Sequence, residues 1–170
     1  YRRLRRTAQQ LGNVVSPDDA ALVMRGLPTM SLRLDKSTES ALLIARWLQD
    51  RHDVSRLLCP ILPGANGHDL WRRDFTGGCG LFSFILRDAD KAARSRFVDA
   101  LNLFGIGYSW GGFESLALPF DVEPVRSAMP WPKPGWREAD SHGIRLSIGL
   151  EDPADLIADL DRGFAALNEG

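Results

Sequence analysis

The stretch from Leu101 to Phe120 constrains the fold more than any other part of the 170-residue sequence. It reads LNLFGIGYSWGGFESLALPF, an apolar run that is broken at its centre by glycine and polar residues and then resumes. This pattern predicts two strand segments on either side of a tight bend at 108–112. Gly111 and Gly112 can take positive φ in such a bend and leave the main chain open to the close approach of another group.

The predicted bend also gathers polar groups of different kinds. Tyr108 and Ser109 bring hydroxyl groups, and Trp110 brings an indole N–H. Backbone N–H donors beside glycines suit a small anionic ligand. A plain β-hairpin would use the same glycines as a turn. The residues by themselves leave the ligand site and the hairpin open as alternatives.

A second informative segment is the strand pattern Ile144-Arg145-Leu146-Ser147-Ile148. Side chains alternate along a strand, so the aliphatic residues face a core while Arg145 and Ser147 face the other way, together with Gly149. A guanidinium fixed on a strand among small residues matches a carboxylate bidentately, which a lysine ammonium does not do. The alternative is a solvent-facing arginine that is paired with a nearby acid.

The remaining patterns predict a small α+β domain. Apolar or small residues at spacings of three and four indicate one long helix that packs a single continuous apolar stripe, or seam, against a core. These residues are Leu27, Met30, Leu34, Ser37, Ala41, Ile44 and Leu48. Further helices are predicted at Tyr1–Gly12, from Ser16 toward Gly26, at His68–Phe75, at Ala89–Leu103 after an Asp88 cap, and from Asp152-Pro153 onward. Strands are predicted at Leu57–Leu62, Leu81–Leu86 and Gly143–Gly149, and an irregular excursion or flap at Asp121–His142.

This order of elements indicates a small, mainly antiparallel sheet covered on one side by helices, with the long N-terminal helix as its spine.

The formal net charge of -1 argues against nucleic acid as the main partner. No apolar run reaches the ~20 residues needed to cross a membrane. Cys59 and Cys79 lack metal-type spacing, so we expect no metal site and interpret both as buried thiols in a reducing cytoplasm, the alternative being a disulfide. We expect His68 to make a structural hydrogen bond and Gly77–Gly80 to form a turn.

Three motifs in the right order give a specific resemblance that extends over essentially the whole chain. They are GHDLWRRDFTGGCGLFSF at 67–84, YSWGGFES at 108–115 and IRLSIGLEDPADLIADL at 144–160. Together they resemble the C-terminal part of the pyridoxal-phosphate-dependent Cys/Met metabolism enzymes, which have the aspartate-aminotransferase-like fold type I. Related γ-synthases and γ-lyases tend to have leucine at the position of Trp110, so this residue favours the β-lyase branch.

The resemblance implies roles for individual residues. Arg145 resembles the arginine that binds the substrate α-carboxylate, Ser109 and Trp110 resemble the pair that gives this carboxylate further donors, and Tyr108 would line the pocket. Gly111 and Gly112 form the backbone bend. The implied activity is carbon–sulfur bond cleavage in cystathionine or a related β-substituted cysteine, as part of methionine biosynthesis, by a cytoplasmic homo-oligomer.

Pyridoxal phosphate chemistry also needs a lysine that forms a Schiff base. The sequence contains only Lys36, Lys91 and Lys133, and none of them matches the lysine of the family. We therefore expect the chain to bind no cofactor by itself and to be catalytically inert. Residues 1–15 would be a remnant of the missing large cofactor-binding domain, and 16–170 a C-terminal substrate-carboxylate-binding domain. The alternative is a free-standing, non-catalytic module that binds amino acids or associates with itself.

Overall fold

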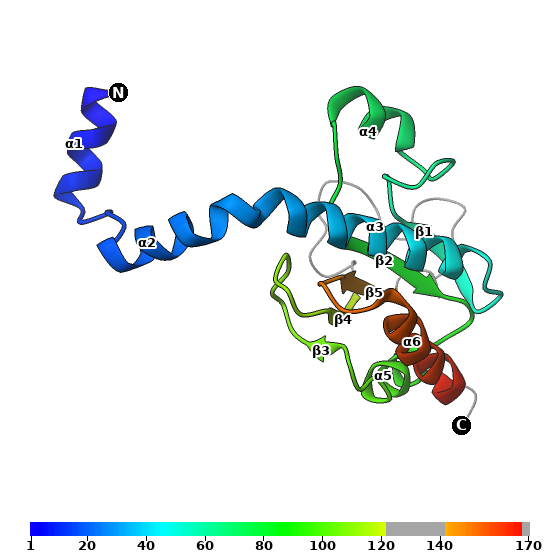
Figure 1. The fold of residues 1–170 in the computed structure, drawn as a ribbon. Helices are drawn as coiled ribbons and strands as arrows, with labels where there is room; N and C mark the ends of the chain where they lie inside the picture. The colour runs from blue at the N-terminus through cyan, green and yellow to red at the C-terminus, as the bar shows by residue number, and fades with distance from the viewer. Residues whose placement is uncertain (122–141, 168–170) are drawn as a thin grey trace. The chain divides into compact units, whose positions relative to one another are not determined.

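The computed structural model describes residues 1–121 and 142–167 (Figure 1), so the predicted excursion at 122–141 lies outside the described residues. The helices are α1 (Arg2–Gln10), α2 (Pro17–Gly26), α3 (Met30–Gln49), α4 (His68–Asp74), α5 (Lys91–Asp99) and α6 (Pro153–Leu167), with a 3₁₀ turn η1 (Leu27–Thr29) between α2 and α3. The strands are β1 (Val54–Leu58), β2 (Leu81–Leu86), β3 (Gly105–Ile106), β4 (Leu116–Asp121) and β5 (His142–Ser147). Within these ranges no helix is long and apolar enough to cross a membrane.

The chain divides into two compact units, 1–32 and 33–170. The first unit contains α1, α2 and η1, and none of these three elements has a buried residue. Ser16 caps α2 as predicted, because its Oγ accepts the Asp19 N–H at 3.1 Å while Pro17 occupies the first turn. The domain boundary predicted after residue 15 stays a prediction.

The second unit is built on a five-stranded sheet with the order β1-β2-β5-β4-β3. The pairs β1–β2, β2–β5 and β5–β4 are antiparallel, and β3 runs parallel to β4. Helices α3, α5 and α6 bury their apolar residues against one face of this sheet (Figure 1). The predicted α+β class, with a mainly antiparallel sheet covered on one side by helices, is confirmed.

Three phenylalanines form the centre of the core. Phe97 on α5 packs edge-on against Phe164 on α6, with ring centroids 4.9 Å apart, and against Phe84 on β2 at 5.9 Å. Gly163 permits this approach, because a Cβ at that position would lie 2.8 Å from the Phe97 ring. The two C-terminal helices are therefore locked together and to the middle of the sheet.

The prediction of one continuous seam along the long helix is wrong for its first half. Leu27, Met30 and Leu34 are 59%, 52% and 43% exposed, and η1 interrupts the helix before Met30. The buried residues of the seam lie further along α3, at Ala41, Ile44 and Leu48. Periodicity identified the apolar face correctly, but only the second half of that face covers the sheet.

Two element boundaries also differ from the prediction. The strand expected at 57–62 lies at Val54–Leu58, because Pro60 has no N–H for a ladder and the Leu62 N–H turns back to the Cys59 carbonyl at 2.9 Å. The helix expected after an Asp88 cap begins at Lys91 instead. Asp90 is its cap and accepts the Ala93 N–H at 2.8 Å.

The early end of α5 has a long-range cause in the carboxylate of Asp159. This side chain lies on α6, is fully buried, and accepts the backbone N–H groups of Asn102, Leu103 and Phe104 at 2.8–3.1 Å. Burial by itself would raise the pKa of Asp159, but these donors and the Arg162 guanidinium outweigh it, so the pKa is lowered. The three N–H groups face Asp159 instead of continuing a helix.

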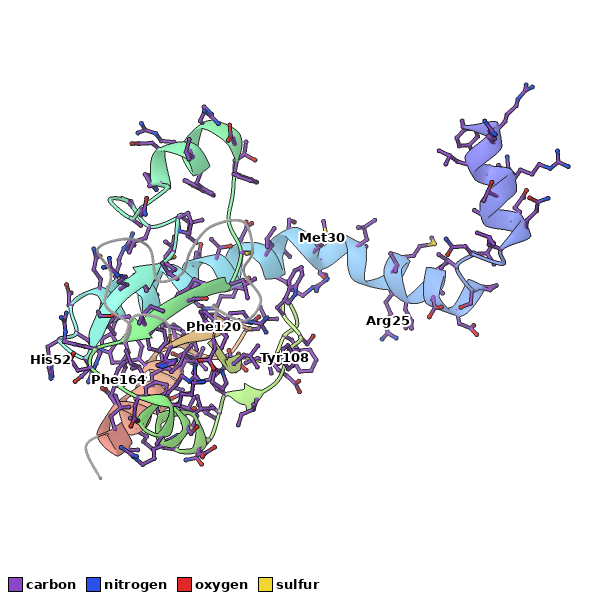
Figure 2. All side chains as sticks on the ribbon, turned by 180° about the vertical axis from the view of Figure 1, so that it is seen from behind. Arg25, Met30, His52, Tyr108, Phe120 and Phe164 are labelled. Atoms are coloured by element: carbon purple, nitrogen blue, oxygen red, sulfur yellow. The ribbon has the colours of Figure 1, made fainter. Side chains whose placement is uncertain are left out.

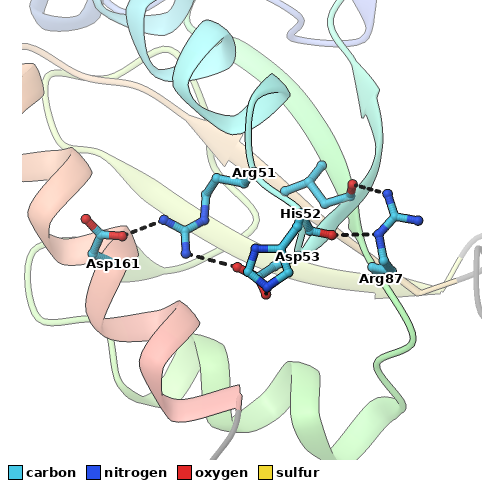
Figure 3. A network of polar contacts seen from close by, with 6 residues as sticks. Arg51, His52, Asp53, Arg87 and Asp161 are labelled. Carbon is cyan, nitrogen blue, oxygen red and sulfur yellow. Dashed lines mark hydrogen bonds and ion pairs between the residues drawn. The ribbon is translucent and has the colours of Figure 1, made fainter.

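A second polar network fixes the turn from α3 into β1 (Figure 3). Arg51 donates to Asp161 on α6 at 2.6 Å and to Asp53 at 3.0 Å, and its guanidinium lies 4.0 Å from the centroid of the Phe164 ring. Arg87 donates to the His52 carbonyl at 2.6 Å. The edge of the sheet at β1 is thereby tied to α6 and to the end of β2.

Two single-residue predictions have mixed outcomes. His68 makes the expected hydrogen bond, with its Nδ1 2.9 Å from the Pro60 carbonyl oxygen. Cys59 is buried, and burial raises the pKa of its thiol to about 11. Cys79 is exposed, which contradicts the prediction of two buried thiols.

Candidate functional site

The candidate site lies on the face of the sheet opposite the helices. Along β5, Ile144 and Leu146 are fully buried in the core, as the alternation predicts. Arg145 and Ser147 lie on the other face, beneath the 107–115 segment that joins β3 to β4. Two side chains of one strand therefore support the bend from below.

Arg145 contacts the bend directly. The two N–H groups of its Nη2 are shared among three backbone carbonyl oxygens, those of Gly107 at 3.2 Å, Tyr108 at 2.9 Å and Ser109 at 2.9 Å. Its Nε is buried and has no hydrogen-bond partner among the described residues. The alternative interpretation was an arginine paired with a nearby acid. In the described part of the chain Arg145 makes no such ion pair.

The bend itself differs from the simplest expectation. Gly111 has φ +77°, as predicted, whereas Gly112 is not among the positive-φ residues. The Gly111 N–H donates to Ser147 Oγ at 3.1 Å and is therefore already used within the protein. Because β3 pairs parallel to β4, the hairpin alternative is wrong.

The side chains of the bend face outward. Tyr108 is 84% exposed (Figure 2), and Trp110 and Phe113 are 64% and 69% exposed. Ser109 is exposed as well. The structure thus brings all the predicted binding residues to one corner of the unit, above Arg145, and their role in binding stays a prediction.

Sequence reasoning missed the residues that hold the end of this bend. Ser115 is 1% exposed, and its backbone N–H and its hydroxyl both donate to the carboxylate of Glu151, at 2.7 and 2.8 Å. Its Oγ accepts the Gly149 N–H at 2.9 Å. Glu151 lies in the LEDP segment between β5 and α6, and nothing local in the sequence indicates its partner.

An ionic cluster joins the far end of β4 to α5 and β5. Asp121 accepts from Arg94 at 2.8 Å and from Lys91 at 3.1 Å, and its carboxylate lies 2.8 Å from Nδ1 of His142. Burial raises the pKa of Asp121, but the hydrogen bonds from these three side chains lower it by more, so the net direction is downward. This cluster contains one of the chain's lysines and keeps it in an ion pair.

The described residues do not fit a Schiff-base cofactor site. Lys91 is paired with Asp121, Lys36 is exposed on α3, and Lys133 lies outside the described residues. Neither of the two described lysines contacts Arg145 or the bend through any hydrogen bond in the structure. Any lysine chemistry would have to come from outside these ranges.

The fold identifies the class of protein. The fold is that of the pyridoxal-phosphate-dependent fold type I enzymes. One solved structure, of O-acetylhomoserine sulfhydrylase from the methionine biosynthetic pathway of Wolinella succinogenes, is 29% identical with a TM-score of 0.74. The likeness covers 94% of this chain and 41% of that one.

The chain belongs to the Cys/Met metabolism PLP-dependent enzyme family, whose sequence model matches residues 1–165. The cystathionine beta-lyase of Escherichia coli K12 is 44% identical over 170 residues, covering 98% of this chain and 42% of that protein. The cystathionine gamma-lyase of Mus musculus is 37% identical, covering 96% of this chain and 41% of that protein. The family resemblance is confirmed, and the chain spans about two fifths of the length of these relatives.

Proposed function

We propose that this chain is the substrate-carboxylate-binding part of a carbon–sulfur lyase of the β-lyase type. The proposed reaction is the α,β-elimination of L-cystathionine to homocysteine, pyruvate and ammonia in methionine biosynthesis. The observation that carries the proposal is the position of the Arg145 guanidinium, within hydrogen-bond distance of the bend that bears Ser109 and Trp110. The higher identity to the E. coli β-lyase than to the mouse γ-lyase supports the β-elimination branch.

In this proposal Arg145 binds the α-carboxylate of the substrate. Three carbonyl oxygens hold its Nη2, which fixes the plane of the guanidinium and directs the remaining N–H groups. Ser109 and Trp110 give further donors to the same carboxylate, and Tyr108 lines the pocket beside it. Because a fixed carboxylate restricts rotation about the bond to Cα, this binding also helps to orient the Cα–H bond for removal.

The elimination itself needs groups that the described residues do not contain. Pyridoxal phosphate supplies the electron sink in enzymes of this family, and its lysine is expected in the part of the polypeptide outside this chain. The contribution of this chain is therefore binding and orientation. Oligomerisation, and the choice among cystathionine, cystine and related compounds, would depend on the whole polypeptide.

The test uses the complete enzyme and the substitution Arg145→Ala. Loss of charge-assisted hydrogen bonds worth about 1.5–3 kcal/mol should raise the KM for cystathionine about 10- to 100-fold, with a smaller change in kcat. Arg145→Lys should restore only part of the loss, because an ammonium lacks the planar guanidinium whose Nη2 the three carbonyl oxygens hold. Arg72→Ala, which removes an exposed arginine on α4, is the control. An unchanged KM in Arg145→Ala would remove the proposed role.

The proposal also predicts that the 170-residue chain alone is inert. The purified chain is mixed with pyridoxal phosphate and cystathionine, and the release of pyruvate is measured against the same mixture without protein. We expect no release above this blank. Release above the blank would show that this chain contains its own cofactor chemistry.

A second candidate function is a free-standing module that associates with itself. Its support is the number of large apolar side chains that are exposed near the N-terminus: Tyr1, Leu4, Leu11, Val14, Val15, Leu22, Val23, Met24, Leu27, Met30, Leu32 and Leu34. The mass of the polypeptide expressed in the native cell separates the two candidates. A product of about twice this length or more favours the enzyme, and a product of this length favours the module.

A further inference from the structure

Ser115, the last residue before β4, uses every polar group that it has. Its N–H and O–H donate to the two carboxylate oxygens of Glu151 at 2.7 and 2.8 Å. Its Oγ accepts the Gly149 N–H at 2.9 Å, and its carbonyl accepts the N–H of Gly105 in β3 at 3.0 Å. A buried residue with all of its groups satisfied in this way has one stable position.

The segment that carries Glu151 is itself held tightly against the bend. The Leu150 N–H donates to the Phe113 carbonyl at 2.9 Å. At Gly149, a Cβ would lie 2.1 Å from the Phe113 carbonyl oxygen and 2.6 Å from a carboxylate oxygen of Glu151. The two backbones are therefore in direct contact, and only glycine fits between them.

The bend is thus anchored at both of its ends. Arg145 holds the carbonyl oxygens of residues 107–109, and Glu151 holds Ser115 six residues after Ser109. Residues 110–114 between these anchors are exposed, and two hydrogen bonds hold them, from Gly111 N–H to Ser147 Oγ and from Leu150 N–H to the Phe113 carbonyl. Release of the second anchor would loosen the end of the bend at Ser115, and a shift of the bend would displace the carbonyl oxygens that orient Arg145.

We propose that Glu151 is a positioning residue of the carboxylate-binding site. Acting through Ser115, it fixes the bend in the conformation that aims the Arg145 guanidinium, and it does not touch the substrate. The inference rests on the proposed function, because it assigns Glu151 to the same site. It predicts that the effect of a substitution at Glu151 on carboxylate binding depends on the presence of the Arg145 guanidinium.

The experiment measures the binding of L-alanine to the complete, cofactor-loaded enzyme by calorimetry at 25 °C. L-alanine has the α-carboxylate but no leaving group at Cβ, so binding is separated from turnover. We expect Glu151→Ala to weaken L-alanine about tenfold, while kcat for the lyase substrate changes less than twofold and KM rises. Glu151→Gln should weaken binding less, because its amide oxygen still accepts the Ser115 N–H. Glu114→Ala removes the exposed neighbouring carboxylate and should have no effect.

The decisive comparison repeats Glu151→Ala in an Arg145→Ala background. There we expect less than a twofold further loss, since the group that Glu151 positions is gone. Equal losses in both backgrounds, or a loss no larger than that of Glu114→Ala, would overturn the role of Glu151. If Arg145→Ala itself leaves L-alanine binding unchanged, the proposed function fails first. Should Glu151→Ala not fold, Ser115→Ala replaces it under the same criteria.

Discussion

The substitution Asp159→Asn tests how much the Asp159 carboxylate stabilises the segment that follows α5. Oδ1 of Asp159 accepts from Asn102 and from Arg162, and Oδ2 accepts from Leu103 and Phe104. An asparagine has the same shape, but only one of its two terminal atoms can accept a hydrogen bond. The substitution therefore leaves two donors facing an NH₂ group.

The expected cost follows from these lost acceptors. Each buried donor without an acceptor costs about 1–3 kcal/mol, so two of them lower the free energy of unfolding by about 2–6 kcal/mol. This is a large part of the stability of an ordinary domain, which is roughly 5–15 kcal/mol. Asp161→Asn on the same helix removes an exposed partner of Arg51 and should cost at most about 1 kcal/mol.

The effect should also depend on pH in a defined direction. The pKa of Asp159 is lowered in the folded state, so the carboxylate stabilises the fold above its unfolded pKa of about 3.9. This contribution is lost as the pH falls below that value toward the folded pKa. The wild-type protein should therefore lose its advantage over Asp159→Asn in acid.

Urea unfolding followed by circular dichroism at pH 7, 5 and 3 measures the cost of Asp159→Asn, the cost of Asp161→Asn and the pH dependence of the difference from the wild type. The reasoning is refuted if Asp159→Asn unfolds at the same urea concentration as Asp161→Asn. It is also refuted if the difference from the wild type stays constant from pH 7 to pH 3, because the carboxylate charge would then not be its source.

Three further predictions concern the core and its ionisable groups. Gly163→Ala should destabilise the protein by about 1–3 kcal/mol in urea unfolding, because the new methyl group overlaps the Phe97 ring. Iodoacetamide at pH 8 should alkylate Cys79 promptly but Cys59 only after unfolding, as mass spectrometry of the peptides will show; equal rates would contradict the burial and the raised pKa of Cys59. Asp121→Asn should lower the melting temperature at pH 7 by more than at pH 3, because the stabilisation from the lowered pKa of Asp121 is complete above about pH 4 and is lost progressively as the pH falls toward the folded pKa.

The face of the sheet on which each strand side chain lies could be predicted from sequence, because side chains alternate between the two faces with a period of two residues. Once Ile144 and Leu146 are assigned to the core, Arg145 must lie on the other face. The same reasoning does not extend to α3. Leu34 and Ile44 belong to one apolar stripe, yet the first is 43% exposed and the second fully buried. Periodicity gives the apolar face of a helix and says nothing of what covers it.

The site could be predicted only in part, for a related reason. The proximity of Arg145 to the bend was expected from the motifs, and the structure has it. Ser115 and Glu151 are 36 residues apart, and Asp159 meets Asn102 across 57 residues. These carboxylates satisfy backbone N–H groups that no local pattern marks as needing a partner, so only the tertiary fold reveals them.

The three carbonyl oxygens around Nη2 of Arg145 have a thermodynamic consequence. A free arginine side chain has about 2 kcal/mol of rotamer entropy, which an anion would normally have to remove on binding. Here the protein removes most of that freedom during folding. An anion that reaches this guanidinium therefore meets a rigid receptor, and more of the interaction energy remains as affinity.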